Sequence, residues 1–212
     1  MTGQNKKAEK ERNKRLLIVV SAPSGTGKTT LCNEVIKQLP NLSFSVSHTT
    51  REPRPGEKHG ENYYFVPEET FKQKVKKGKI AEWTEIYGNF YGTAKETIER
   101  EFDRGIDLIF DIDERGGRQL SEAFSDVVTV LILPPSMEIL KKRLVDRGTN
   151  KKEDIDRRLK QAEEEIKGMS WYSYVIVNDE VEKAVLQLKG IITAERCRHD
   201  HSLVERLLDN GS

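Results

Sequence analysis

The feature that most constrains the fold is a short apolar run followed directly by a glycine-rich turn and a helix. Residues 16–20 are rich in branched apolar side chains, which is typical of a strand buried in a parallel sheet. The turn covers residues 21–27, and the apolar spacing over residues 28–39 predicts a helix that ends before Pro40. A strand, a glycine-rich turn and a helix in direct succession predict an α/β protein.

The turn fits the pattern GxxxxGK[ST] at every defined position except the first, where Ala22 replaces glycine. Small residues let successive backbone N–H groups turn inward around phosphate oxygens, and the helix that follows adds its positive end. We expect Lys28 to reach the β- and γ-phosphates of a nucleoside triphosphate, and the Thr29 hydroxyl to bind Mg²⁺. An incidental turn is the alternative, but a turn between a buried strand and a helix favours nucleotide binding. The predicted phosphate loop consists of Ala22, Pro23, Ser24, Gly25, Thr26, Gly27, Lys28, Thr29 and Thr30.

Further apolar runs alternate with helical patterns along the chain, which predicts a mostly parallel central sheet flanked by helices. The runs cover residues 107–112, 127–133 and 175–177, and the helical patterns lie near residues 95–104 and from residue 181 onwards.

Two stretches depart from this core pattern. Short strand-like segments and a turn-rich loop predict a small mixed β lobe, and a highly charged helical stretch interrupted at Gly148 predicts a lid. We therefore expect a flexible basic tail at 1–15, one domain at 16–196 and a C-terminal extension at 197–212. Within the domain the core is expected at 16–42, 95–135 and 170–196, the inserted lobe at about 43–94 and the lid at about 136–169.

Composition narrows the classes of partner. The chain has 36 basic and 35 acidic side chains, a net charge of +1, and this balance argues against bulk nucleic-acid binding. No apolar run approaches the length of about 18 residues needed to span a bilayer, so no membrane partner is expected. Cys32 and Cys197 lie far apart, which favours reduced thiols in a cytoplasmic protein. The sequence leaves open whether the chain is a monomer or a homo-oligomer.

Two groups of charged residues suggest further binding positions. Arg51 and Arg54 lie on a proline-rich loop, where paired guanidinium groups would bind a phosphate dianion; a solvated basic loop is the alternative. Asp111 and Asp113 follow a predicted strand beside the phosphate loop. Asp111 is the candidate for the magnesium shell, unless both carboxylates only cap the end of the strand.

Six segments, read together, resemble the guanylate kinase family. They are APSGTGKTT, SVSHTTREPRPGE, NYYFV, GNFYGT, LIFDID and LKKRLVDRGT, and they occur in the family's order and spacing over about residues 16–195. The resemblance implies a P-loop kinase fold with a GMP-binding lobe. It also implies transfer of the γ-phosphoryl group of ATP to GMP, giving ADP and GDP, with Mg²⁺ as cofactor.

The resemblance also implies roles for individual residues. Arg51, Arg54, Tyr63 and Tyr91 match the positions that hold the GMP phosphate. Residues that match the guanine contacts are Glu82 and Asp113, for the base N–H groups, and Ser47 and Thr93, for O6. Arginines that match the family's lid, and that would act with Lys28 in catalysis, are Arg143, Arg147 and Arg158.

One segment departs from the family. After the DID segment the family usually carries glutamine and then Gly-Ala or Gly-Val, whereas this chain has Glu114, Arg115, Gly116 and Gly117. We expect Gly117 to loosen the start of the helix that follows.

Two alternative functions remain. One is a related kinase acting on another phosphorylated acceptor, such as a ribose bisphosphate; the presence of Glu82 and Asp113 argues against it. The other is a non-catalytic protein-binding module, against which the intact Lys28 argues.

Overall fold

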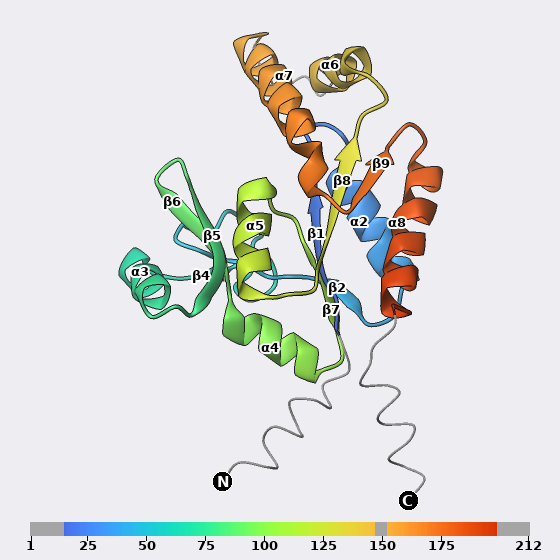
Figure 1. Cartoon of the computed structure of the whole chain (residues 1–212). Helices are drawn as coiled ribbons and strands as arrows, with labels where there is room; N and C mark the ends of the chain where they lie inside the picture. Colours follow the sequence, from blue (N-terminus) through green and yellow to red (C-terminus); the bar gives the residue numbers. More distant parts are fainter. Residues whose placement is uncertain (1–14, 147–151, 199–212) are drawn as a thin grey trace, which may run out of the picture.

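The computed structural model describes residues 15–146 and 152–198, and its centre is a five-stranded sheet (Figure 1). The strand order is β2-β7-β1-β8-β9, and all neighbouring strands run parallel. The strands are β1 (Leu17–Ser21), β2 (Leu42–Phe44), β7 (Asp107–Phe110), β8 (Val127–Leu133) and β9 (Tyr174–Val177). The predicted fold class, a mostly parallel sheet flanked by helices, is confirmed.

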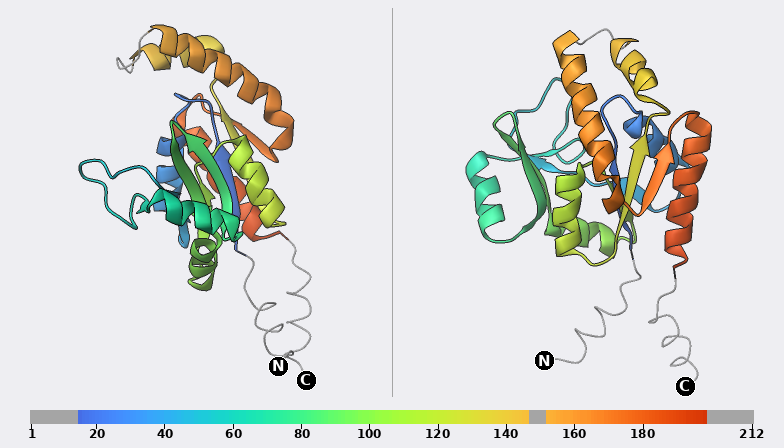
Figure 2. Two further views of the ribbon diagram at one scale, coloured as in Figure 1. Left: turned by 90° about the vertical axis from the view of Figure 1, so that its left-hand side faces the viewer. Right: turned by 45° about the horizontal axis from the view of Figure 1, so that its top comes forward.

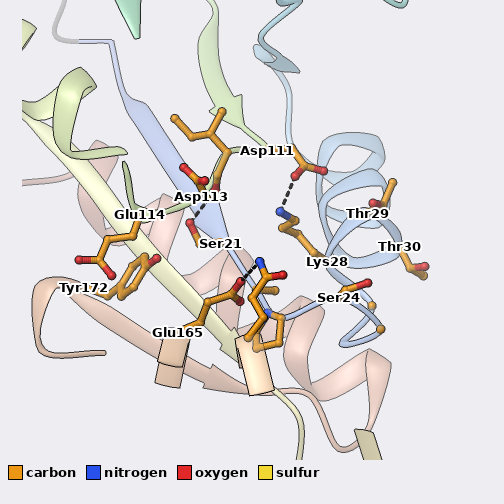
Figure 3. A pocket seen from close by; sticks show the side chains of 16 residues that line it. Ser21, Ser24, Lys28, Thr29, Thr30, Asp111, Asp113, Glu114, Glu165 and Tyr172 are labelled. Carbon is orange, nitrogen blue, oxygen red and sulfur yellow. Dashed lines mark hydrogen bonds and ion pairs between the residues drawn. The ribbon is translucent and has the colours of Figure 1, made fainter. Parts of the chain in front are cut away.

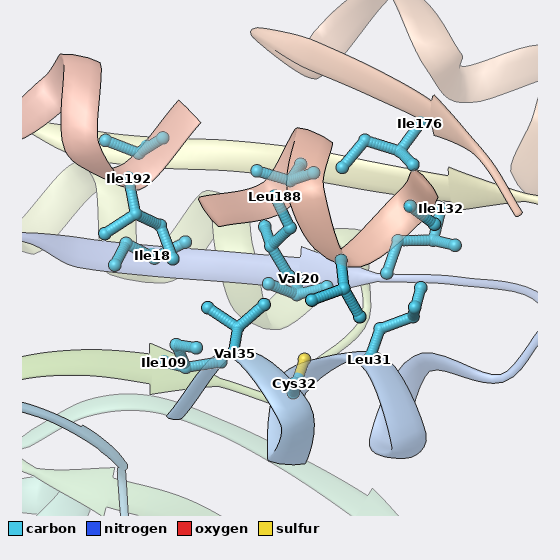
Figure 4. Close-up of a cluster of buried hydrophobic side chains, with 14 of the residues drawn as sticks. Ile18, Val20, Leu31, Cys32, Val35, Ile109, Ile132, Ile176, Leu188 and Ile192 are labelled. Carbon is cyan, nitrogen blue, oxygen red and sulfur yellow. The ribbon is translucent and has the colours of Figure 1, made fainter. Parts of the chain in front are cut away.

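Helices cover both faces of this sheet because its strands are apolar on both sides. On β1, Ile18 and Val20 pack against α2 (Lys28–Gln38) and α8 (Val181–Arg196), as Figure 4 shows. Leu17 and Val19 point to the opposite face, where α4 (Lys95–Asp103) and α5 (Glu114–Ala123) lie. All four β1 side chains are at most 2% exposed. Burial on both faces explains why the strand reads as a continuous apolar run rather than an alternating one.

A second sheet forms a separate lobe beside the core (Figure 1). Its order is β4-β3-β6-β5; β3 and β4 are parallel and the other pairs are antiparallel. The strands are β3 (His48–Thr49), β4 (Tyr64–Phe65), β5 (Ile80–Ile86) and β6 (Asn89–Ala94). The lobe also contains α3 (Glu68–Lys76), which the sequence did not predict. Phe71, stacked on Phe90, is the one buried residue of that helix, so its sequence carries almost no apolar periodicity.

Two helices lie beyond the carboxyl ends of the core strands (Figure 2). They are α6 (Met137–Asp146) and α7 (Lys152–Lys167), which pack on each other through Leu140, Leu144, Ile155 and Ala162. A short 3₁₀ helix, η1 (Gly168–Trp171), leads from α7 back to β9. Gly148, the predicted interruption, lies outside the described residues, as do residues 1–14 of the predicted tail and residues 199–212 of the predicted extension.

Two boundaries differ from the sequence prediction. Strand β2 pairs with β7 in the core sheet, so the predicted start of the lobe at residue 43 falls inside a core strand. Helix α5 begins at Glu114 with Asp113 as its N-cap, so Gly116 and Gly117 are buried helical residues. The helix therefore begins before Gly117 rather than after it, and the expectation that Gly117 loosens the helix start stays a prediction. No helix in the described part of the chain has the length and apolar character of a membrane span.

Candidate active site

The phosphate loop connects β1 to α2 and is held from two sides. Gly25 and Gly27 have φ values of 96° and 98°, which favour glycine. A Cβ on Gly25 would lie 2.9 Å from Cδ2 of Leu144 on α6, and one on Gly27 would lie 2.8 Å from Nδ2 of Asn178. That same Nδ2 donates a hydrogen bond of 2.6 Å to the carbonyl oxygen of Thr26. Helix α6 and the residue after β9 therefore both fix the conformation of the loop.

The loop opens into a cavity of about 410 Å³ (Figure 3). Lys28 points into it and forms an ion pair with Asp111, which follows β7. Ala22, which replaces the first glycine of the pattern, also lines the cavity and does not have a positive φ. The substitution therefore causes no backbone strain. Thr29 and Thr30 also lie on this cavity and expose their side chains.

The cavity continues toward the second lobe, because Asp111 also lines two further cavities, of about 450 and 370 Å³. Besides Asp111, the smaller one brings together five residues that match the family's GMP contacts: Ser47, Tyr63, Glu82, Tyr91 and Asp113. The fully buried Thr93 lies behind them, with its Oγ1 3.4 Å from Oγ of Ser47.

Glu82 is an unusual carboxylate because it is almost fully buried, with 2% of its surface exposed. Burial raises its pKa to about 7, since water no longer solvates the charge; hydrogen bonding from Thr93 opposes this rise, and Asp113 adds a smaller increase. Its Oε1 is buried without a hydrogen-bond partner. Its Oε2 faces Gly116 so closely that a Cβ there would lie at 3.2 Å. A buried acceptor without a partner indicates a missing donor.

Asp113 both caps a helix and lines two of the cavities. Its Oδ1 accepts a hydrogen bond of 2.9 Å from the backbone N–H of Gly116, which caps α5. It also lines both the 410 and the 370 Å³ cavities. Asp113 therefore caps the start of a helix, where the sequence had left open the capping of a strand end, and it also lies beside the cavities.

The paired arginines of the loop after β3 are arranged differently from each other. Arg51 donates two hydrogen bonds to Glu57, of 2.8 and 3.0 Å, and lies over the ring of Tyr63. The bond to Glu57 is the main reason that the pKa of Arg51 is raised and that of Glu57 is lowered. Arg54 is exposed, and its backbone N–H donates to Glu57 at 2.7 Å. Glu57 thus organises the loop that carries both guanidinium groups.

Two of the predicted lid arginines contact the loop or its support. Arg158 on α7 donates a hydrogen bond of 2.6 Å to Oγ of Ser24 in the phosphate loop. Arg143 on α6 donates one of 3.1 Å to the carbonyl oxygen of Asn178. Arg147 lies outside the described residues.

Comparison with known proteins identifies the family. Residues 14–195 match the family model described as "Guanylate kinase". The chain belongs to the guanylate kinase family. The guanylate kinase of Geobacter metallireducens is 50% identical over 183 residues, which cover 86% of this chain and 90% of that relative. The guanylate kinase of Myxococcus xanthus is 45% identical over 193 residues, covering 91% and 92%.

A solved structure of the family has the same architecture. The crystal structure of guanylate kinase from Anaplasma phagocytophilum superposes with a TM-score of 0.67 at 35% identity, covering 89% of this chain and 88% of that one. The resemblance inferred from the six sequence segments is confirmed.

Several residues line or support the site without having been predicted from the sequence. Gln161 and Glu165 reach the 410 Å³ cavity from α7, and Tyr172 reaches it from the segment before β9. Burial raises the pKa of both Glu165 and Tyr172. Asn178 was missed too, although its place directly after the last core strand was a usable signal, because ligands in parallel sheets bind at the carboxyl ends of strands.

Proposed function

We propose that this chain transfers the γ-phosphoryl group of ATP to GMP, giving ADP and GDP. The observation that carries the proposal is that the cavity of the phosphate-loop lysine and the cavity of the buried Glu82 share the wall formed by Asp111 and Asp113. ATP would place its phosphates at Lys28, and GMP would place its base at Glu82.

Guanine matches the polar groups of the smaller cavity. Its N1–H and its exocyclic amine are donors, and the unpartnered Oε1 of Glu82 is a buried acceptor. Its O6 is an acceptor, for which Ser47 and Thr93 carry hydroxyl donors. Adenine would turn its N1 acceptor toward the carboxylate and leave two buried groups unpaired, which disfavours it strongly. An acceptor without a base, such as a ribose bisphosphate, would leave Glu82 without a donor as well.

The GMP phosphate would bind on the side of Arg51 and Arg54. Arg51 lies over Tyr63, and the ring of Tyr63 lies 6.0 Å from that of Tyr91, so a guanidinium group and two hydroxyls are close enough to converge on one dianion. One guanidinium nitrogen of Arg51 already donates to both carboxylate oxygens of Glu57, which keeps the guanidinium oriented before the ligand arrives.

Transfer itself requires positioning and charge rather than a base, because the acceptor oxygen of GMP is already anionic at neutral pH. Lys28 would bind the β- and γ-phosphates. Arg158 would add charge from the lid, since it already touches the phosphate loop at Ser24. Arg143 and Arg147 are assigned to the same lid function.

The donors near the loop fit a magnesium ion. Thr29 offers a hydroxyl oxygen and Asp111 a partly exposed carboxylate, both of the hard oxygen type that Mg²⁺ prefers, and phosphate oxygens and water would fill the remaining positions. Bound there, Mg²⁺ would neutralise charge on the phosphates. The cytoplasmic location inferred from the two cysteines stays a prediction.

A coupled assay of ADP formation tests the proposal. With ATP and Mg²⁺, turnover should require GMP and should be weak with AMP, CMP or UMP. Glu82→Gln should raise the KM for GMP and leave the KM for ATP near its wild-type value. Equal turnover with AMP, or with a ribose bisphosphate, would contradict the assignment of the acceptor.

A further inference from the structure

Gln119, on α5, forms two hydrogen bonds to the backbone of a single residue in the other lobe. Its Oε1 accepts a hydrogen bond from the N–H of Trp83, and its Nε2 donates one to the carbonyl oxygen of Trp83; both are 3.0 Å long. Trp83 lies on β5, the edge strand of the second sheet. The carboxamide of Gln119 therefore binds the free edge of β5 much as a neighbouring strand would.

This contact lies one residue from Glu82, whose buried carboxylate lines the 370 Å³ cavity, called the acceptor cavity below. The nitrogen that Gln119 holds is bonded to the carbonyl carbon of Glu82, so the contact restricts the backbone on which that carboxylate sits. Side chains alternate along a strand. Glu82 and Thr84 therefore line the cavity, whereas Trp83 packs on the other side, with its ring 5.8 Å from that of Phe90.

Helix α5 carries three residues that meet the acceptor cavity or its strand. Its N-cap Asp113 lines the cavity. Gly116, one turn later, lies so close to the carboxylate of Glu82 that a Cβ would be 3.2 Å from Oε2. Gln119 follows after another three residues, on the same side of the helix. One helix thus determines the distance between the two carboxylates, although they belong to different lobes.

We propose that Gln119 is a positioning residue that sets the selectivity for guanine by holding Glu82 at its place beside Asp113. The inference rests on the proposed function, in which Glu82 binds the base of GMP. Gln119 touches neither the substrate nor the reacting atoms. Without it, β5 would remain paired with β6 and packed on α5 through Ala81 and Leu120, but it would lose both hydrogen bonds that fix Trp83, and the carboxylate would move relative to Asp113.

Two substitutions separate positioning from mere stability. Gln119→Leu removes both hydrogen bonds at similar volume. Gln119→Glu keeps an acceptor for the N–H of Trp83 but places an oxygen, in place of the donor, opposite the carbonyl oxygen of Trp83. This variant provides the test if Gln119→Leu does not fold. The matched control is Gln73→Leu, an exposed glutamine of α3 in the same lobe that bonds only within its helix in the described structure, to Glu69 at 3.2 Å.

The expected result is a selective loss for the acceptor. The KM for GMP should rise about tenfold in Gln119→Leu, since two net hydrogen bonds of usual strength correspond to a change of that order. It should also rise in Gln119→Glu, which keeps the bond from the N–H of Trp83 and loses the one to its carbonyl oxygen. The ratio of kcat/KM for GMP to that for AMP should fall by a similar factor. The KM for ATP should stay unchanged, and Gln73→Leu should behave as wild type.

A double substitution identifies the route by which Gln119 acts. If Gln119 works through Glu82, adding Gln119→Leu to Glu82→Gln should cause no further loss of kcat/KM for GMP. A further tenfold loss, or a Gln119→Leu protein with a lower Tm and unchanged GMP selectivity, would overturn the proposal. If Glu82→Gln alone leaves the KM for GMP unchanged, the assignment of Glu82 fails, and this inference fails with it.

Discussion

At pH 8, replacing Glu82 by glutamine should make the protein more stable and much less active. The wild-type carboxylate is buried and its pKa is about 7, against an ordinary value of 4.5. Its folded pKa therefore lies above its unfolded pKa, so the folded chain binds a proton between pH 4.5 and 7 that the unfolded chain does not. The stability contributed by this group is fully present below pH 4.5 and is lost as the pH rises through 7.

The size of the effect follows from that difference in pKa. At 1.36 kcal/mol per pH unit, the difference corresponds to about 3 kcal/mol at pH 8 as an upper value. Glutamine has the same shape and no charge, but its NH₂ group would take a place at which Oε1 has no partner, which costs about 1–3 kcal/mol. We expect Glu82→Gln to raise the free energy of unfolding at pH 8 by about 1 kcal/mol, and to lower it at pH 4.

Urea denaturation at pH 8 and at pH 4 measures this change, and a GMP titration measures its functional cost. The KM for GMP should rise on the order of 100-fold, because a charge-assisted acceptor for two N–H groups is lost. Glu85→Gln, an exposed glutamate on the same strand, is the matched control and should change neither quantity. If the stability difference between Glu82→Gln and wild type is the same at both pH values, burial of the charge is not its cause.

Three further predictions follow from the same geometry. Below pH 7 the KM for GMP should rise, approaching tenfold per pH unit, because guanine requires the ionised form of Glu82; a flat profile from pH 5.5 to 8 would contradict this. Lys28→Ala should reduce kcat on the order of 10³-fold, whereas Arg51→Ala should mainly raise the KM for GMP in the same assay. Gly117→Ala should lower the free energy of unfolding by about 1–3 kcal/mol in urea denaturation, because its Cβ would lie 2.5 Å from the ring of Trp171; an unchanged value would show that the ring moves aside freely.

The core of this fold could be predicted because its signals are local. The strand, the phosphate loop and the following helix are adjacent in sequence, and the predicted run at 127–133 coincides with β8. Helix α3 could not be predicted in the same way, since Phe71 is its one buried residue. The position of α3 depends on contact with Phe90, which lies on β6 and is distant in sequence.

The residues that support the site were harder to predict than the residues that line it. The role of an arginine on a proline-rich loop, or of a lysine after a glycine turn, can be predicted from the type of residue and its neighbours in sequence. Gln119 and Asn178 act on backbone groups 36 and 152 residues away, and a glutamine or asparagine bonded to a distant peptide looks no different in sequence from one bonded to water. Ion pairing between Arg51 and Glu57 was missed for a related reason, because the sequence shows which charges are near but not which pair.

Contacts between α5 and η1 explain why the chain has Glu114 and Gly117 at the start of α5. Trp171 lies where a Cβ on Gly117 would be, and Glu114 lies where a Cβ on Gly168 would be, with each hypothetical contact at 2.5 Å. In both α5 and η1, a glycine faces a side chain of the other element. The two backbones therefore approach more closely than larger residues would permit. Gly117 therefore matches the position of Trp171 in η1, and an alanine or valine at this position would require that ring to shift.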